Sequence, residues 1–215
     1  DAERLAILLR SGSLPVKIEI LENRTVGPTL GQDSKEKSIK AFGIGIAGVF
    51  VFMILFYRLS GIVADIALLL YVMMLLLAMR YLGATLTLPG IAGIILSIGM
   101  AVDANVLIFE RFKEEIRRGK TLRSAMDSGF GRAFVTIFDS NVTTLMAAAI
   151  LFYLGTGPIK GFAVTLALGV LLSMFTAITV TKYLLRFLIY SRFTQNPWIF
   201  GVAAPKADSA KEVSK

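Results

Sequence analysis

Five long apolar runs divide the chain, and each is long enough to cross a bilayer as a helix. They cover residues 41–57, 62–79, 86–109, 133–153 and 161–181. About 20 residues of helix, within a range of about 17–25, cross a hydrocarbon core ~30 Å thick. The first and last runs contain no charged residue, and the other three contain one aspartate each: Asp65, Asp103 and Asp139. This pattern predicts an all-α polytopic membrane protein with five transmembrane helices.

The segments between these runs predict three tight turns and one surface helix. Residues 58–61, 80–85 and 155–158 are too short to form anything but turns. Residues 110–126 place Phe112, Ile116, Leu122 and Met126 at near-helical spacing among basic residues. An amphipathic helix of this composition is typical of a membrane surface. We therefore expect 110–126 to lie along the cytoplasmic face of the bilayer.

The two ends of the chain are polar. Val16, Ile18 and Ile20 alternate with charged residues, which predicts a strand. Because a lone strand is not stable in water, we expect 1–40 to be the end of an extracytoplasmic α+β domain that continues upstream. A lead-in helix capped by Asp33 or Ser34 would follow. Residues 188–215 are expected to form a disordered cytoplasmic tail.

Composition agrees with a membrane protein and excludes several kinds of site. Hydrophobic residues make up 55% of the 215 residues, and the net charge is +8. The basic residues flank the apolar runs, which favours contact with anionic lipid over binding of nucleic acid. The chain contains no cysteine and no histidine, so it lacks a thiol nucleophile, an imidazole base and the usual zinc ligands. We expect no metal, no cofactor and no enzymatic activity.

Charge asymmetry predicts the orientation of the chain. The basic residues of 110–132 and of 182–192 fall on the same side when five spans alternate in direction. Cytoplasmic loops carry an excess of lysine and arginine. The N-terminus of the chain is therefore expected to be extracytoplasmic and the C-terminus cytoplasmic.

Asp103 and Asp139 are expected to form one proton-coupling site. Asp103 lies seven residues before Glu110, and Asp139 lies seven residues after Arg132. At 1.5 Å per residue, both carboxylates lie roughly 10 Å inside the cytoplasmic rim on successive antiparallel helices. Nearby hydroxyl and amide side chains would support the site through hydrogen bonds. These residues are Asn105, Ser140, Asn141, Thr143 and Thr144.

A stripe of small residues runs along the third apolar run. Gly93, Ser97 and Ala101 recur every four residues and so share one face of a helix. Small residues allow two helix backbones to approach each other closely. We expect this stripe to pack against another helix and to help line the contact with a partner protein.

Simpler structural interpretations stay open for some of these residues. The polar side chains of the fourth run could serve only as contacts between helices. Asp65 could be a carboxylate at the membrane rim, where a helix N-terminus favours negative charge. A role as a helix contact explains Asp103 less well, because a neutral amide would make the same contacts at lower cost. No run contains lysine or arginine, so Asp103 must be protonated part of the time or meet a cation of another chain.

Four motifs resemble the SecD/SecF family of bacterial protein-export membrane proteins, which belongs to the resistance-nodulation-division superfamily of proton-driven transporters. In chain order they are LAILLRSGSLPVKIEILENRTVGPTLG, LTLPGIAGIILSIGMAVDANVLIFERFKEE, TIFDSNVTTL and LGTGPIKGFAVTLALGVL. The resemblance covers about residues 5–187. It implies that the five runs are part of a six-helix half, with one further span and most of an exported domain lying upstream.

The resemblance also implies a function and a set of site residues. It implies an accessory subunit of the Sec preprotein translocase in the bacterial plasma membrane, which uses the proton motive force at late steps of export. The implied partners are SecF, separate or fused, the SecYEG translocon and unfolded preproteins. The proton-linked aspartate of the family matches Asp103, and the DSNxTT motif matches 139–144. Tyr71 departs from the asparagine that family members often have, which leaves the role of the second run open.

Two other functions remain possible from the residues alone. A small-molecule efflux subunit of the same superfamily would also need a proton-carrying aspartate. An intramembrane aspartyl protease would use two acids on neighbouring helices. The residues around Asp103 do not read GxGD, and Asp139 does not follow a tyrosine. These departures make the protease the remote alternative.

Overall fold

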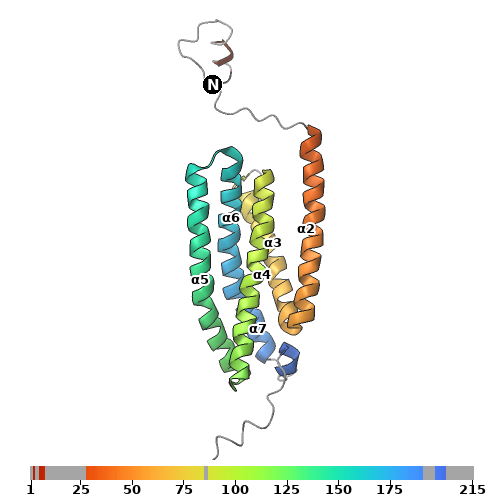
Figure 1. Cartoon of the computed structure of the whole chain (residues 1–215), viewed down its shortest axis with the longest axis vertical. Coiled ribbons are helices and arrows are strands. Elements are labelled where there is room, and N and C mark those ends of the chain that lie inside the picture. Colours follow the sequence, from red (N-terminus) through yellow and green to blue (C-terminus); the bar gives the residue numbers. More distant parts are fainter. Residues whose placement is uncertain (1, 3–4, 8–27, 85–86, 191–196, 202–215) are drawn as a thin grey trace, which may run out of the picture. The chain divides into compact units, whose positions relative to one another are not determined.

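The computed structural model describes residues 2, 5–7, 28–84, 87–190 and 197–201. The chain divides into two units, 1–34 and 35–215, and the helix bundle belongs to the second. The helices are α2 (Pro28–Tyr57), α3 (Leu59–Tyr81), α4 (Leu88–Arg117), α5 (Leu122–Leu154), α6 (Gly157–Phe175) and α7 (Lys182–Tyr190) (Figure 1). A π-helical segment, η1 (Thr176–Thr181), joins α6 to α7, and a 3-10 turn, η2 (Pro197–Phe200), follows.

The prediction of an all-α protein with five apolar spans is confirmed. Five helices are long and apolar enough to cross a membrane: Glu36–Tyr57, Leu59–Tyr81, Leu88–Arg117, Leu122–Leu154 and Gly157–Tyr190. The described residues contain no strand. The strand expected at 16–20 and the tail at 203–215 lie outside the described residues, as does most of the expected α+β remnant at 1–40.

The predicted spans are shorter than the observed helices at most ends. Arg58 alone connects α2 to α3, with a φ angle of 51°, and α6 already begins at Gly157. α2 begins at Pro28, so Asp33 and Ser34 lie within the helix and the predicted cap there is wrong. The reason is that helical hydrogen bonds continue past the last apolar residue, whereas hydropathy marks only the part in lipid.

The predicted surface helix 110–126 does not exist as one element. Its first part continues α4 to Arg117, its second part begins α5 at Leu122, and a turn at Gly119 with a φ angle of 85° separates them. Phe112, Ile116 and Met126 are buried in the protein core. The apolar face that predicted lipid contact therefore holds the α4–α5 hairpin against the other helices.

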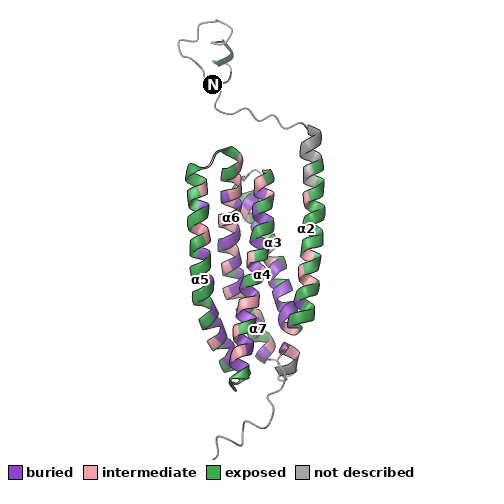
Figure 2. Ribbon diagram, viewed as in Figure 1, coloured by how far each residue is buried: buried purple, intermediate pink, exposed green. Residues whose placement is uncertain are grey.

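Three helices form the centre of the bundle, and two lie at its periphery. The apolar windows of α3, α4 and the span that starts with α6 are each 44% buried, against 6% for α2 and 17% for α5. Figure 2 shows the corresponding exposed surfaces along α2 and α5. The outer faces of these two helices are therefore left for lipid or for a partner protein.

The last described residues pack against the end of the bundle that holds the α4–α5 turn. Phe200 is fully buried, and its ring meets that of Phe112 edge to face at 5.6 Å. Residues up to Tyr190 belong to α7, where Leu185 and Ile189 are buried. The expectation of a disordered tail from residue 188 is therefore wrong for 188–190 and 197–201, because their apolar side chains complete the core.

Candidate functional site

Asp103 lies in the middle of α4 and points away from the core. Its neighbours Ala101, Ala104 and Asn105 are buried, whereas Asp103 itself is exposed. Thr87 fixes the start of the helix by accepting a hydrogen bond from the Gly90 backbone N–H at 3.1 Å. The hydrogen bonds and ion pairs of the described residues include none to the Asp103 carboxylate. An acid at membrane depth thus faces the outside of this chain.

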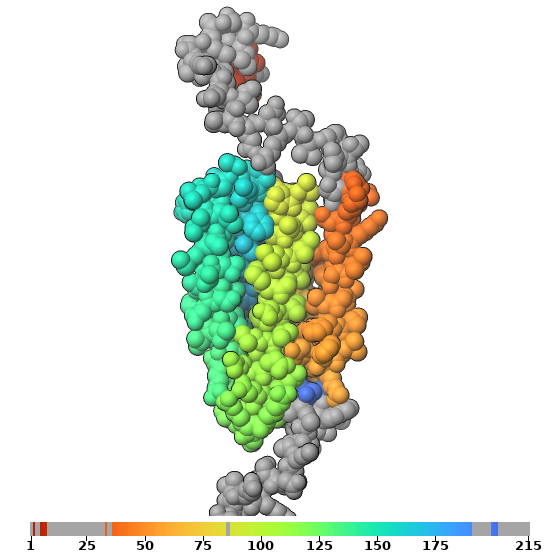
Figure 3. Space-filling model, viewed as in Figure 1, coloured from red at the N-terminus to blue at the C-terminus, as the bar shows by residue number. Residues whose placement is uncertain are grey.

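The same exposed line on α4 contains Ala92, Leu96 and Gly99. A Cβ atom added at Gly99 would meet no other heavy atom within 4 Å. The surface of α4 is visible between α5 and α2 in the space-filling view (Figure 3). The side of α4 that carries Asp103 is therefore open to lipid or to another polypeptide.

Asp139 and most of the polar residues around it also lie on an exposed face, that of α5. Asp139, Ser140 and Thr143 are exposed, and Asn141 is buried. The Thr143 hydroxyl donates to the Asp139 carbonyl at 3.2 Å, and the Thr144 hydroxyl donates to the Ser140 carbonyl at 3.2 Å. These hydroxyls are bonded within α5, so they do not join α5 to another helix of this chain.

The register between α4 and α5 places the two acids at the same level. Gly129 lies against the backbone of Phe112, since a Cβ atom there would lie 2.9 Å from the Phe112 Cα. Asp103 is nine residues from this contact along α4, and Asp139 is ten residues from it along α5. Both are therefore about 14–15 Å from it. Among the described residues no hydrogen bond joins Asp103 and Asp139, so they share a depth but not a direct contact.

The small-residue stripe of α4 faces the inside of the bundle. A Cβ atom at Gly93 would overlap the Thr165 side chain of α6, and one at Gly169 of α6 would overlap Ser97. Ser97 is fully buried, and Ala101 is 3% exposed. The stripe packs α4 against α6 and α3 of the same chain. The expectation that it lines a partner surface is therefore wrong, because these residues are buried within this chain.

Tyr71, the residue that departs from the family pattern, binds the centre of this stripe. The Tyr71 hydroxyl donates to Ser97 Oγ at 2.7 Å, and Ser97 Oγ donates to the Ile94 carbonyl at 2.8 Å. Tyr71 is fully buried. The second span therefore contributes a hydrogen bond at the point where α3, α4 and α6 meet, a pairing that the residue pattern did not predict.

Asn105 connects α4 to the π-helical segment. Its Nδ2 donates to the Ala101 carbonyl at 3.2 Å, and its Oδ1 accepts from the Thr181 hydroxyl at 2.8 Å. Thr181 is fully buried at the end of η1. π-helical turns frequently occur at functional sites, and this one is bonded to Asn105, two residues from Asp103 along α4.

Asp65 is the residue that the sequence interpretation misplaced. It lies in the second turn of α3, beyond the first turn where a helix N-terminus favours a carboxylate, and it is 6% exposed. Both of its carboxyl oxygens are buried without a hydrogen-bond partner. Hydropathy alone could not identify this burial, because it depends on the packing of α3 against helices distant in sequence.

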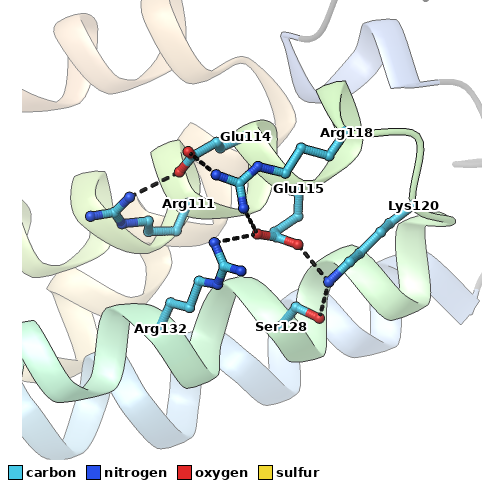
Figure 4. Close-up of polar contacts among 7 residues, drawn as sticks. All are labelled: Arg111, Glu114, Glu115, Arg118, Lys120, Ser128 and Arg132. Carbon is cyan, nitrogen blue, oxygen red and sulfur yellow. Dashed lines mark hydrogen bonds and ion pairs between the residues drawn. The ribbon is translucent and has the colours of Figure 1, made fainter.

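The charged residues of the α4–α5 hairpin form a network around Glu115 (Figure 4). The Glu115 side chain is 1% exposed and pairs with Lys120 at 2.6 Å, Arg132 at 3.0 Å and Arg118 at 3.1 Å. The neighbouring Glu114 pairs with Arg111 at 2.9 Å and with Arg118 at 2.7 Å. Much of the basic charge expected to contact lipid headgroups is therefore paired with acids that hold the hairpin together.

The described residues hold no cluster of three or more acids or other common metal ligands. Asp103 and Asp139 lie on separate helices, and each can bind a proton but not enclose a cation by itself. What remains is two exposed acids at one level, on α4 and α5, with the hydrogen-bonded pair Asn105–Thr181 buried behind α4.

Comparison with known proteins identifies the family. Residues 10–191 match the family described as "Protein export membrane protein SecD/SecF, C-terminal". The chain is 76% identical over 213 residues to "Protein translocase subunit SecD" of Acidaminococcus fermentans, covering 98% of this chain and 51% of that protein. It is 57% identical to the protein of the same name from Synechocystis sp., covering 93% of this chain and 43% of the relative. The chain thus spans about half the length of these relatives.

The fold agrees with solved structures. The chain superimposes with a TM-score of 0.78 and 47% identity on a crystal structure of SecDF, a translocon-associated membrane protein from Thermus thermophilus. This match covers 87% of the chain and 26% of that protein. A structure of SecDF in a super-membrane-facing form matches with a TM-score of 0.73 and 48% identity, over 86% of the chain and 25% of that protein. The chain belongs to the SecD/SecF family of protein-export membrane proteins, whose C-terminal membrane region it contains.

Proposed function

We propose that this chain is the membrane region of an accessory subunit of the Sec preprotein translocase in the bacterial plasma membrane. It uses the proton motive force to drive late steps of protein export. The relatives named as translocase subunits support this role. The partners would be a SecF half, separate or fused, the SecYEG channel and the emerging preprotein. A small-molecule efflux role has no support from the relatives, which are named for protein translocation.

The exposed position of Asp103 is the observation that carries the proton-coupled part of this proposal. An unpaired ionised carboxylate in hydrocarbon is costly, yet this side chain faces outward from the bundle. A face of this kind needs a second polypeptide that supplies a cation or a hydrogen-bond donor when Asp103 loses its proton. Asp139, at the same level on α5, would extend the polar face. Moving one charge across 100 mV releases about 2.3 kcal/mol, which is enough to bias a helix rearrangement.

The proposed residues have different roles. Asp103 binds and releases the proton, and Asp139 modulates this from the neighbouring helix. Asn105 holds the π-helical segment against α4 through Thr181. Ser140, Asn141, Thr143 and Thr144 shape the α5 face, and Gly93, Ser97 and Ala101 fix α4 against its neighbours. Movement of α4 relative to these helices would pass to the exported domain.

Replacement of the carboxylate tests this function. Asp103→Asn keeps the size and hydrogen-bonding capacity of the side chain but cannot release a proton. In a strain depleted of the native subunit, we expect this variant to reach wild-type levels in the membrane and to restore less than about a tenth of export. Such a loss corresponds to at least ~1.4 kcal/mol in the coupled step. Asp139→Asn is expected to lose less.

Asp127→Asn provides the matched control. Asp127 is an exposed aspartate of α5 near its cytoplasmic end, outside the proposed site. Its replacement makes the same chemical change outside the proposed site and is expected to leave export unchanged. Full export with Asp103→Asn at normal protein levels would refute the role of Asp103 as proton carrier.

A further inference from the structure

Asp65 and its neighbour Ser60 are the exceptions to the pairing of buried polar groups in this bundle. The Asp65 carboxyl oxygens and Ser60 Oγ are the buried side-chain polar atoms that lack a partner among the described residues. Elsewhere, buried hydroxyl and amide groups are bonded, as in Tyr71, Ser97 and Thr181. Burial of an ionised carboxylate without a partner costs several kcal/mol. Burial in this conformation therefore favours the neutral, protonated form of Asp65 over the carboxylate.

The elements around α3 supply no counter-charge to Asp65. α3 packs against α4, α6, α7, η1 and η2, and its Gly61 lies against α2. η1 and η2 contain no titratable side chain. Lys113 of α4 pairs with Glu110 and lies 4.1 Å from the ring centre of Tyr57 on α2, and Lys182 of α7 lies beside Phe130.

The other titratable groups on these helices likewise form no ion pair or hydrogen bond with Asp65 in the described part of the chain. They are Asp103, Arg111, Glu114, Glu115 and Arg117 on α4, Lys160 on α6, and Tyr183, Arg186 and Tyr190 on α7. Within the described residues, no hydrogen bond or ion pair stabilises an ionised Asp65, so its ionised form would depend on solvent or on a rearranged backbone.

Asp65 and Asp103 lie at the same level on two sides of the bundle. The rings of Tyr57 and Phe109, 5.8 Å apart, define a common layer near the cytoplasmic end. Asp65 lies six residues after the start of α3, and Asp103 lies six residues before Phe109. Each is therefore about 9 Å from that layer. Asp103 faces outward, whereas Asp65 faces the interior.

The helix that carries Asp65 packs along the π-helical segment. η1 is in contact with α3, and its Thr181 hydroxyl reaches both the Asn105 side chain, at 2.8 Å, and the Thr176 carbonyl, at 3.4 Å. A hydroxyl proton can be shared between two acceptors, and here the shorter contact joins η1 to α4 while the longer one lies within η1. A wide turn of this kind is a natural place for the backbone to change its pairing.

We propose that Asp65 is a second proton-binding site, inside the bundle, and that its deprotonation requires α3 to separate from the π-helical segment Thr176–Thr181. The proton leaves to water, and the remaining carboxylate accepts hydrogen bonds from water and hydroxyls admitted by this separation. The packed conformation described here is the protonated state. This inference extends the proposed function, since two acids at one depth would link proton release at Asp103 to a change inside the bundle.

Infrared difference spectroscopy tests proton binding at Asp65 directly. The full-length protein with its SecF half is reconstituted in phospholipid bilayers, and spectra are compared between mildly acidic and alkaline pH. We expect the carbonyl-stretch band of a buried protonated carboxyl group to disappear as pH rises. Asp65→Asn is expected to remove this band entirely, and Asp65→Glu to retain it at a shifted frequency. Ser60→Ala, which removes the neighbouring unpaired hydroxyl and keeps the carboxyl group, is the matched control and is expected to retain the band.

Amide hydrogen exchange tests the coupled movement in the same samples. At alkaline pH, after correction for the chemical exchange rate, protection of η1 and the start of α3 is expected to fall in the wild-type protein and to stay constant in Asp65→Asn. If the wild-type spectrum shows no pH-dependent band, or if Asp65→Asn does not remove that band, the proposed site is wrong. A titrating Asp65 with unchanged protection of η1 would overturn the movement. Normal export by Asp103→Asn, with the Asp65 band present, would refute the proposed function and leave this inference intact.

Discussion

At the scale of single residues, the centre of the bundle depends on small side chains that let the helices approach closely. Ser97 of α4 accepts a hydrogen bond from the Tyr71 hydroxyl and lies directly against Gly169 of α6. The three helices are therefore joined at one point by a hydroxyl, a hydroxymethyl group and a bare backbone. Substitutions here separate the steric contribution from that of the hydrogen bond.

Gly169→Ala is expected to destabilise the bundle more than Tyr71→Phe does. The alanine methyl group would overlap Ser97, and overpacking of this kind costs about 1–3 kcal/mol. Tyr71→Phe removes one buried hydrogen bond, worth about 1 kcal/mol, and leaves Ser97 bonded to the Ile94 carbonyl. Unfolding of the purified protein in detergent measures both changes.

Gly99→Ala is the control for the loss of a helical glycine. This position on α4 has open space around it, so alanine is expected to be neutral or stabilising by up to ~1 kcal/mol. Equal destabilisation by Gly169→Ala and Gly99→Ala would show that the close contact with Ser97 is unimportant.

At the scale of elements, α4 has two faces with different tasks. Its inner face, with Gly93, Ser97 and Ala101, is buried against α3 and α6. Its outer face carries Gly99 and Asp103 and is exposed within this chain. A partner that neutralises Asp103 must therefore approach the outer face.

Cysteine crosslinking distinguishes these two faces. Gly99→Cys is expected to crosslink to cysteines placed along the spans of the SecF half, because its side chain would project beside Asp103 from the open side of α4. Ser97→Cys, buried on the inner face, is expected to give no crosslink to SecF. If Gly99→Cys instead reacts only with thiol reagents dissolved in lipid, this face contacts the bilayer and the proposed shared site is wrong.

At the scale of the whole molecule, the turns of the bundle lie at two opposite ends. The α2–α3 and α4–α5 connections and the end of α7 share one end, where Tyr57, Phe109, Phe112 and Ile189 join one apolar cluster. The α5–α6 turn lies at the other end (Figure 1). The excess of basic residues in the first group predicts that this end is cytoplasmic.

Accessibility of single cysteines in intact cells tests this orientation. These 215 residues contain no cysteine, so each substitution introduces a single thiol in this region. Thr156→Cys, in the α5–α6 turn, is expected to react with a membrane-impermeant thiol reagent added outside. Arg117→Cys, exposed at the end of α4, is expected to react only after the membrane is broken. The reverse pattern would invert the proposed topology.

Much of the fold follows from the sequence because a bilayer constrains it so strongly. Backbone groups in hydrocarbon must be hydrogen-bonded within a helix, so apolar length alone predicts five spans. The positions of Asp103 and Asp139 relative to Glu110 and Arg132 likewise predict a common depth, since helical rise is fixed. The family resemblance also rests on contiguous motifs, which can be read directly from the sequence.

Tertiary structure decided which way each side chain faces, and hydropathy contains no such information. The residues of 110–126 are amphipathic both on a membrane surface and in a hairpin, and only packing of Phe112 and Met126 against other helices distinguishes the two. A stripe of small residues fits a partner and a neighbouring helix equally well, and contact with Thr165 and Gly169 placed it inside. The burial of Asp65 depends on helices distant in sequence. Orientation around a helix axis is a property of the assembled bundle, so the sequence determined the spans and their depths, and the fold determined their faces.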